Sequence, residues 1–262
     1  MDQGISDLWK YDSSVIEEAI HVDFENFKSN SANYKIALFN PETNGYKYLR
    51  TLVYQLCRSL TQKQIEKLKR IENKEYGNPI SVTYHGQKIC LDYLQAVYEI
   101  DFIERHNNFE NQYILEIGAG YGRTCHTILS NYDVQRYYIL DLETCLNLSQ
   151  KYLKTVLNEK NYSKIQFVPV ADFPLLENVK FDISINIDSM SEMTSKIVYD
   201  YLLYIDKHSR LFFVKNPVGK YMLNDSSDDT PDQDAVSHAL STGILKDIIE
   251  VEKIITHFLE KL

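Results

Sequence analysis

A glycine-rich turn follows a short apolar segment near the middle of the sequence. The segment is Tyr113-Ile-Leu-Glu-Ile, and glycines stand at 118, 120 and 122 before a helical pattern begins. Glycine adopts left-handed conformations freely and lets a ligand approach the main chain. The G-x-G-x-G spacing differs from that of dinucleotide sites, and no Lys-Ser/Thr pair follows as in a phosphate-binding loop. The turn therefore predicts a ligand site without a pyrophosphate, which Glu116 would repel. A tight turn of any α/β protein is the alternative.

Polar residues also follow the next two apolar segments along the chain. Asp141 comes directly after Tyr137-Tyr-Ile-Leu, 23 residues beyond Gly118. An acid at such a strand end can accept hydrogen bonds from both hydroxyls of a ribose. Ala171 and Asp172 follow the third segment at the place where an adenine would lie. Because parallel sheets bind ligands outside the carboxyl ends of their strands, these residues predict one nucleoside-binding site.

Two carboxylates follow the fourth apolar segment. Asp188 is the first residue after it and Glu192 opens the next helical pattern, with Ser189 and Ser191 between them. A carboxylate placed there can take the proton of an attacking hydroxyl group. Asp188 and Glu192 are therefore the candidate catalytic residues. In the alternative interpretation, a serine caps the helix and Glu192 only stabilises its first turn.

Histidines are the rival bases, because their pKa lies near neutrality. His208 precedes the fifth strand, so it belongs at the amino end of the sheet, away from the ligand. His85, in an expected hairpin, and His238, near an acidic stretch, remain candidates that can reach a cleft. Asn216 ends the fifth strand on the ligand side and can bind an acceptor. A turn residue before proline is the alternative for Asn216.

The apolar pattern divides the chain near residue 110. Before it, helical spacing dominates, a capping box is formed by Thr61 and Gln64, and a hairpin turns at His85-Gly86. After it, short strands alternate with helices, as in a parallel sheet. We predict a Rossmann-like α/β fold, with a helical cap or substrate region (1–110) over the carboxyl edge and a cofactor domain (111–262). The expected helices are 48–57, 61–75, 91–105, 122–130, 143–157 and 194–205, and the strands are 113–117, 137–140, 165–168, 181–187 and 211–214. Residues 244–262 fit helix or strand.

The composition is that of a folded globular protein. The 262 residues are 44% hydrophobic and 25% charged, which excludes a disordered chain. The net charge of −9 argues against nucleic acid as the main ligand, since phosphate binding needs a basic surface. No apolar run is long enough for a membrane span, and no signal peptide is visible, so we expect a cytoplasmic protein. The four cysteines are far apart and predict reduced thiols.

Two of these motifs resemble those of class I S-adenosylmethionine-dependent methyltransferases. They are Tyr113-Ile-Leu-Glu-Ile-Gly-Ala-Gly-Tyr-Gly and Tyr138-Ile-Leu-Asp-Leu-Glu. More narrowly, the chain resembles sugar O-methyltransferases of bacterial surface-polysaccharide gene clusters. The segments that carry this narrower resemblance are Tyr48-Leu-Arg, Gly77-Asn-Pro, Lys151-Tyr-Leu-Lys, Asn186-Ile-Asp-Ser-Met-Ser-Glu-Met and Asn216-Pro.

The resemblance implies methyl transfer to a hydroxyl of a sugar or nucleotide-linked capsule intermediate, including one with a phosphoramidate substituent. It implies a small-molecule or nucleotide-linked acceptor, and we expect a possible homodimer. Some sugar methyltransferases use a divalent metal, but Asp188, Glu192 and the acidic stretch 225–234 show no specific ligand spacing, so we expect no required metal. A nicotinamide-dependent oxidoreductase and a catalytically silent methyltransferase-like subunit are the alternatives. The expected cofactor-binding residues are Glu116, Gly118, Ala119, Gly120, Gly122, Asp141, Leu142, Ala171, Asp172 and Asn186. The expected acceptor-binding residues are Tyr48, Arg50, Asn78, His85, Ser189 and Asn216.

Overall fold

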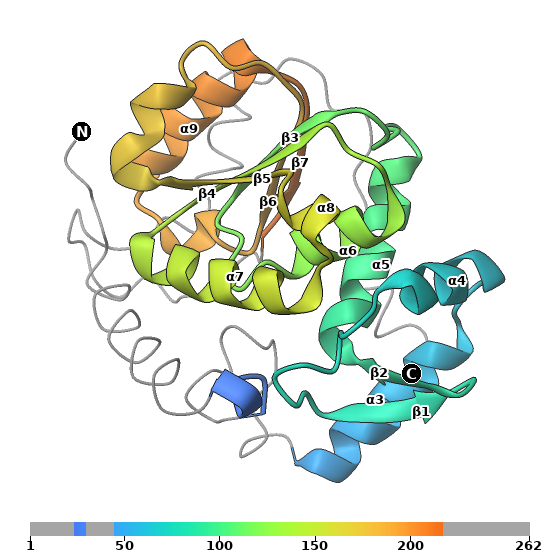
Figure 1. Cartoon of the computed structure of the whole chain (residues 1–262). Coiled ribbons are helices and arrows are strands. Elements are labelled where there is room, and N and C mark those ends of the chain that lie inside the picture. The colour runs from blue at the N-terminus through green and yellow to red at the C-terminus, as the bar shows by residue number, and fades with distance from the viewer. Residues whose placement is uncertain (1–23, 30–44, 217–262) are drawn as a thin grey trace.

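The computed structural model describes residues 24–29 and 45–216, which are built around a parallel five-stranded sheet (Figure 1). Its strands are β3 (Tyr113–Ile117), β4 (Arg136–Asp141), β5 (Ile165–Pro169), β6 (Phe181–Ile187) and β7 (Ser209–Lys215). The strand order is β5-β4-β3-β6-β7, so the order reverses between β3 and β6. Parallel sheets bind ligands at such a switch point, outside the carboxyl ends of the strands. The predicted Rossmann-like α/β fold is confirmed.

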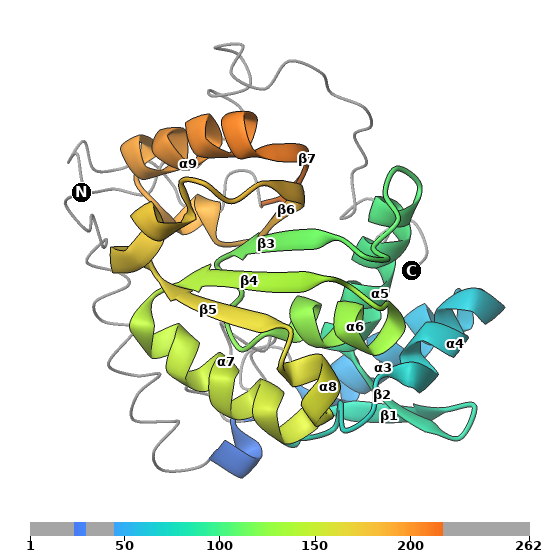
Figure 2. The same cartoon turned by 45° about the horizontal axis from the view of Figure 1, so that its top comes forward.

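Helices cover both faces of this sheet (Figure 2). One face carries α5 (Leu91–Glu104), α6 (Arg123–Asn131) and α7 (Glu143–Val156). The other face carries α9 (Ser195–His208) and the 3-10 helix η3 (Val170–Leu176), and the short helix α8 (Glu159–Tyr162) precedes β5. Side chains alternate between the faces along each strand, so Ile114 packs under α6 and Leu115 under α9.

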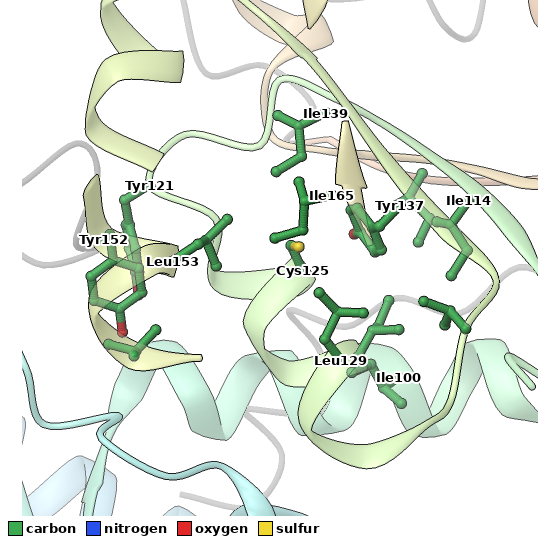
Figure 3. Packing of buried hydrophobic residues seen from close by; sticks show 14 of the residues in the cluster. Ile100, Ile114, Tyr121, Cys125, Leu129, Tyr137, Ile139, Tyr152, Leu153 and Ile165 are labelled. Carbon is green, nitrogen blue, oxygen red and sulfur yellow. The ribbon is translucent and has the colours of Figure 1, made fainter. Parts of the chain in front are cut away.

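The core of the first face fixes the helix that follows the glycine turn. Figure 3 shows strand residues Ile114, Tyr137 and Ile139 together with Cys125 and Leu129 of α6. Full burial of such a side chain contributes about 1.5–3 kcal/mol relative to exposure. Since α6 is held on the sheet in this way, the turn between β3 and α6 has a fixed position.

The N-terminal elements form a separate apolar cluster. They are α3 (Tyr46–Arg58), α4 (Gln62–Arg70) and the hairpin of β1 (Ser81–Tyr84) and β2 (Gln87–Cys90). The predicted capping box is confirmed, because the Gln64 N–H donates to the Thr61 hydroxyl and the Thr61 N–H donates to the Gln64 side chain. Helix α4 ends at Arg70 rather than at Glu75, because Ile71 is extended and fully buried.

The N-terminal elements do not cover the carboxyl edge of the sheet. Their apolar side chains, such as Leu49 and Leu68, pack on Leu94 and Val97 of α5. Figure 2 shows these elements beside α5 and α6, away from the carboxyl ends of β3, β4 and β5. The prediction that the N-terminal region lies over the carboxyl edge is therefore wrong for α3, α4 and the hairpin, because their apolar faces pack against α5.

Several sequence expectations fall outside the described residues. They concern His238, Pro217, the acidic stretch 225–234 and the ambiguous segment 244–262. The division into residues 1–110 and 111–262 stays a prediction. Cys57, Cys90, Cys125 and Cys145 are buried free thiols. Among the helices of residues 45–216, none is long and apolar enough to cross a membrane.

A lysine is buried beside the 3-10 helix η1 (Phe24–Asn26). The side chain of Lys28 is surrounded by the rings of Tyr93, Tyr121 and Tyr152, with its Nζ 5.1, 4.7 and 4.3 Å from their centroids. Its Nζ also donates a hydrogen bond to the Tyr152 hydroxyl at 2.7 Å. Burial lowers the pKa of Lys28 from 10.5 to about 8, because desolvation outweighs the nearby negative charges.

The buried lysine should make the stability of the protein depend on pH. Between pH 8 and 10.5 the unfolded chain binds a proton at Lys28 that the folded chain lacks, so stability rises with pH. The size of this rise is at most roughly 3 kcal/mol. We expect Lys28→Met to remove it in urea unfolding at pH 7 to 10. The exposed Lys151→Met should keep the wild-type slope, and equal slopes in all three proteins would contradict the burial of the charge.

Candidate cofactor and acceptor site

The glycine turn has a left-handed backbone at each of its three glycines. The φ angles are +74° at Gly118, +58° at Gly120 and +93° at Gly122. A Cβ on Gly118 would lie 2.1 Å from the Oγ of Ser189, and one on Gly122 would lie 2.7 Å from Cδ1 of Leu153. A Cβ on Gly120 would meet no atom within 4 Å. The two ends of the turn are thus packed against protein, while Gly120 faces open space.

Asp141 holds this turn to the neighbouring strand. Its Oδ2 accepts a hydrogen bond from the Gly120 N–H at 3.0 Å, and its Oδ1 accepts one from the Leu142 N–H at 2.8 Å. Burial raises the pKa of Asp141 to about 6, although these main-chain donors oppose the shift. The Cys145 thiol and the Ala119 N–H also interact with this carboxylate, so hydroxyl groups of a ligand would share its oxygens with these donors. The half-buried Ala119 and Leu142 border the same carboxylate.

Glu116 lies below the turn rather than at its surface. The side chain is 2% exposed, and it accepts a hydrogen bond from the Tyr137 hydroxyl at 2.8 Å. Burial raises the pKa of Glu116 to about 7, and hydrogen bonds from Tyr137 and Thr124 oppose this shift. The expected position beside a ligand is not observed, because Glu116 shares the strand face of Ile114 and points under α6.

A network of buried amides fixes the loop after β6. Nδ2 of Asn186 donates to the Ile117 carbonyl at 2.9 Å and to the Ser189 hydroxyl at 2.6 Å. Its Oδ1 accepts from Nδ2 of Asn216 at 2.8 Å, and Oδ1 of Asn216 accepts from the Ser191 N–H at 3.0 Å. The structure thus brings three predicted ligand-binding residues together beside the glycine turn. Their hydrogen bonds, however, serve to shape the loop.

The two candidate catalytic carboxylates lie in this loop. Asp188 has a left-handed backbone with φ +62°, and its N–H donates to the Lys215 carbonyl at 2.7 Å. Glu192 ends the 3-10 helix η4 (Met190–Glu192). Burial raises the pKa of Cys145, and the charges of Asp141 and Glu192 add to this shift.

The serines of the loop do not cap the following helix. Ser191 donates to the Asp188 carbonyl at 3.0 Å, and Ser189 donates to the Ile117 carbonyl at 3.2 Å. Helix α9 begins at Ser195, next to the predicted start at 194, and Glu192 lies three residues before it. Glu192 is therefore not a first-turn residue of α9, and the capping interpretation is wrong.

A chain of charged side chains that the sequence does not predict leads away from Asp188. Lys215 Nζ donates to Oδ2 of Asp188 at 3.2 Å and to Oε1 of Glu99 at 2.8 Å. The Glu99 carboxylate also pairs with Arg123 at 3.0 Å. Burial alone would raise the pKa of Glu99, but Arg123 and Lys215 hold it below its ordinary value. These four residues form a compact cluster, called the charge cluster below.

The sequence carries a signal for two of the missed residues. Asp92 and Glu99 are acids at buried positions of an apolar helix, and seven residues place them on one helical face. Asp92 accepts a hydrogen bond from the hydroxyl of Tyr121, which belongs to the glycine turn. Lys215 precedes Asn216 at a strand end, but its partners follow only from the tertiary structure.

Four predicted acceptor-binding residues lie away from this site. Tyr48 and Arg50 lie on the solvent-exposed side of α3, and Tyr48 is 60% exposed to solvent. His85 is exposed in the hairpin turn, and Asn78 donates to the Asn26 side chain at 2.8 Å. These residues lie away from the site because α3 and the hairpin pack on α5.

Two of the expected cofactor-binding residues, Ala171 and Asp172, are exposed at the carboxyl end of β5. This is the position expected for residues that flank a ligand.

Within 24–29 and 45–216, no group of three or more His, Cys, Asp and Glu side chains is arranged to hold an ion. The carboxylates at the sheet edge instead have main-chain, lysine or tyrosine partners.

No family model and no curated protein matches the sequence. Solved structures resemble the chain at low identity. Cyclopropane synthase MmaA2 from Mycobacterium tuberculosis is 14% identical with a TM-score of 0.41, over 80% of this chain and 65% of that one. Magnesium protoporphyrin IX methyltransferase from Synechocystis PCC 6803, with bound S-adenosylhomocysteine, is 16% identical with a TM-score of 0.40, over 57% and 65%.

A third structure, mycolic acid cyclopropane synthase CmaA1 with S-adenosylhomocysteine, is 15% identical with a TM-score of 0.38, over 45% of this chain and 40% of that one. The chain thus spans less than two thirds of the length of each of these solved chains.

The two neighbouring glycines should respond differently to alanine. Gly118→Ala places a methyl group on Ser189 and should destabilise the protein by about 2–4 kcal/mol. Gly120→Ala meets no atom, so only the left-handed backbone costs energy, roughly 1–2 kcal/mol. Urea unfolding measures both. Ser189→Gly should recover part of the Gly118→Ala loss, and equal losses at the two glycines would contradict the packing described here.

Proposed function

We propose that this chain is an S-adenosylmethionine-dependent methyltransferase that binds its cofactor at the carboxyl ends of β3 and β4. The observation that carries the proposal is the position of Asp141. It lies beside the switch point, holds the glycine turn through Gly120, and is an acid at a strand end, where a carboxylate can accept hydrogen bonds from ribose hydroxyls. The fit is supported by the open space at Gly120, which permits close approach of a ligand to the turn.

The residues around this position suit the parts of the cofactor. Asp141 would bind the ribose hydroxyls, and Ala171 and Asp172 at the end of β5 would flank the adenine. The main chain at Gly120 would approach the amino-acid end, with Ala119 beside it. Gly118 and Gly122 serve the shape of the turn, since protein side chains already fill the space next to them.

The loop after β6 would position the acceptor. When bound, S-adenosylmethionine supplies an electrophilic methyl group on a sulfonium, which leaves as a neutral thioether. Positioning the acceptor oxygen in line with that bond provides much of the rate. Glu192 would accept the hydroxyl proton at its carboxylate, and Asp188 would orient the hydroxyl. The amide network of Asn186 and Asn216 keeps this loop in place.

The acceptor class in this proposal is a hydroxyl of a sugar or nucleotide-linked intermediate of capsule biosynthesis, including one with a phosphoramidate substituent. Its support is the sequence resemblance of residues 186–193 to sugar O-methyltransferases. A net charge of −9 does not favour a polyanionic acceptor such as nucleic acid.

Cofactor binding tests the proposal directly. We expect S-adenosylhomocysteine to bind in isothermal titration calorimetry and NAD not to bind. Asp141→Ala should weaken the binding about 10- to 100-fold, because charge-assisted hydrogen bonds contribute roughly 1.5–3 kcal/mol. The exposed Asp133→Ala, in the loop before β4, is the matched control. Binding of NAD alone, or unchanged affinity in Asp141→Ala, would overturn the assignment.

The base is tested with radiolabelled S-adenosylmethionine and extracted nucleotide-linked sugars. Glu192→Gln keeps size and hydrogen bonding but removes basicity, so turnover should fall about 100-fold or more. Affinity for S-adenosylhomocysteine should stay near that of the wild type. Normal turnover in this variant would show that Glu192 is not the base and would leave positioning as the source of the rate.

A further inference from the structure

The charge cluster joins four elements at the carboxyl edge. Asp188 follows β6, Lys215 ends β7, Glu99 lies on α5 and Arg123 opens α6. Lys215 connects two carboxylates, with contacts of 3.2 Å to Asp188 and 2.8 Å to Glu99. The Glu99 side chain is 1% exposed, while that of Asp188 is 33% exposed. The buried end of the cluster is therefore rigid, and Asp188 is its solvent-facing end.

Arg123 ties the same cluster to the glycine turn. It follows Gly122 directly, pairs with Glu99 at 3.0 Å and donates to the Asp92 carbonyl at 3.0 Å. A cation at the first position of a helix opposes the helix dipole, and the Glu99 carboxylate offsets this cost. The pairs Glu99–Arg123 and Asp188–Lys215 leave the cluster with no net charge.

We propose that Lys215 is a positioning residue that holds and neutralises Asp188, so that Asp188 orients the acceptor hydroxyl and Glu192 alone takes its proton. The inference rests on the proposed function and deepens it by giving the two carboxylates different roles. Glu99, held by Arg123, fixes Lys215 from behind. The Lys215 ammonium occupies one oxygen of Asp188 and balances its charge, and the remaining lone pairs of a carboxylate can still accept a hydrogen bond from a hydroxyl.

Sinefungin gives a test that needs no acceptor. This cofactor analogue carries an amine where the transferred methyl group would be, so its ammonium reports the charge on the acceptor side. S-adenosylhomocysteine lacks that group and serves as the neutral reference. The measured quantity is the ratio of the two dissociation constants, by calorimetry at one pH and salt concentration. A change that merely loosens the fold moves both constants together and leaves the ratio unchanged.

The variants should move this ratio in opposite directions. Lys215→Met exposes the charge of Asp188 and should tighten sinefungin about 3- to 10-fold relative to S-adenosylhomocysteine. Glu99→Gln removes a negative charge and should weaken the binding of sinefungin about 3-fold relative to S-adenosylhomocysteine. In the Asp188→Asn background, Lys215→Met should lose most of its effect, as a coupled pair requires. Lys215→Arg should keep the wild-type ratio.

The control is Lys164→Met, which removes an ion pair with Asp133 far from the site and should leave the ratio unchanged. An unchanged ratio in Lys215→Met, or the same change with Asn at 188, overturns the positioning role. If the wild type binds neither sinefungin nor S-adenosylhomocysteine, the proposed function itself is overturned. The two failures are thus distinguishable.

Discussion

The carboxylate of Asp141 accepts hydrogen bonds from the N–H groups of Gly120 and Leu142. The bond from Gly120 joins the turn after β3 to the end of β4, and the bond from Leu142 fixes the carboxylate on its own strand. A turn with three left-handed glycines has little conformational preference of its own, since glycine adopts positive and negative φ angles about equally well. The hydrogen bond from the Gly120 N–H to the Asp141 carboxylate restricts this backbone freedom. Its burial is unfavourable, as its raised pKa indicates, and the main-chain donors offset part of this cost. The geometry of the site depends on this balance.

Helix α5 supports the same turn from the other side. Asp92 accepts a hydrogen bond from the hydroxyl of Tyr121, and Glu99 pairs with Arg123, so two acids on one helical face hold the end of the turn that leads into α6. The helix also carries the cluster of α3, α4 and the hairpin on its outer side. Helix α5, which precedes the first strand of the sheet, thus helps to position the candidate site through Asp92 and Glu99, although both side chains are buried.

The sequence predicts the parts of this structure that depend on local periodicity. The five strands, the glycine turn, the position of Asp141 and the capping box at Thr61 all follow from spacing. The location of the N-terminal elements does not, because an apolar helix face does not specify its partner. The burial of Glu116 also follows from the strand pattern, because residues two apart in a strand point to the same face and Ile114 is an apolar core residue. The partners of Lys28 and Lys215 are distant in sequence, so only the fold brings them together.

Ser189 occupies the space that a side chain at position 118 would need. The loop that would choose the acceptor and the turn that would hold the cofactor are therefore not independent modules. Exchange of this loop between related proteins succeeds only if the incoming residue at 189 is as small as serine, or if the turn changes with it. Positions 118 and 189 should consequently covary during divergence, which limits the routes by which the loop can evolve or be grafted.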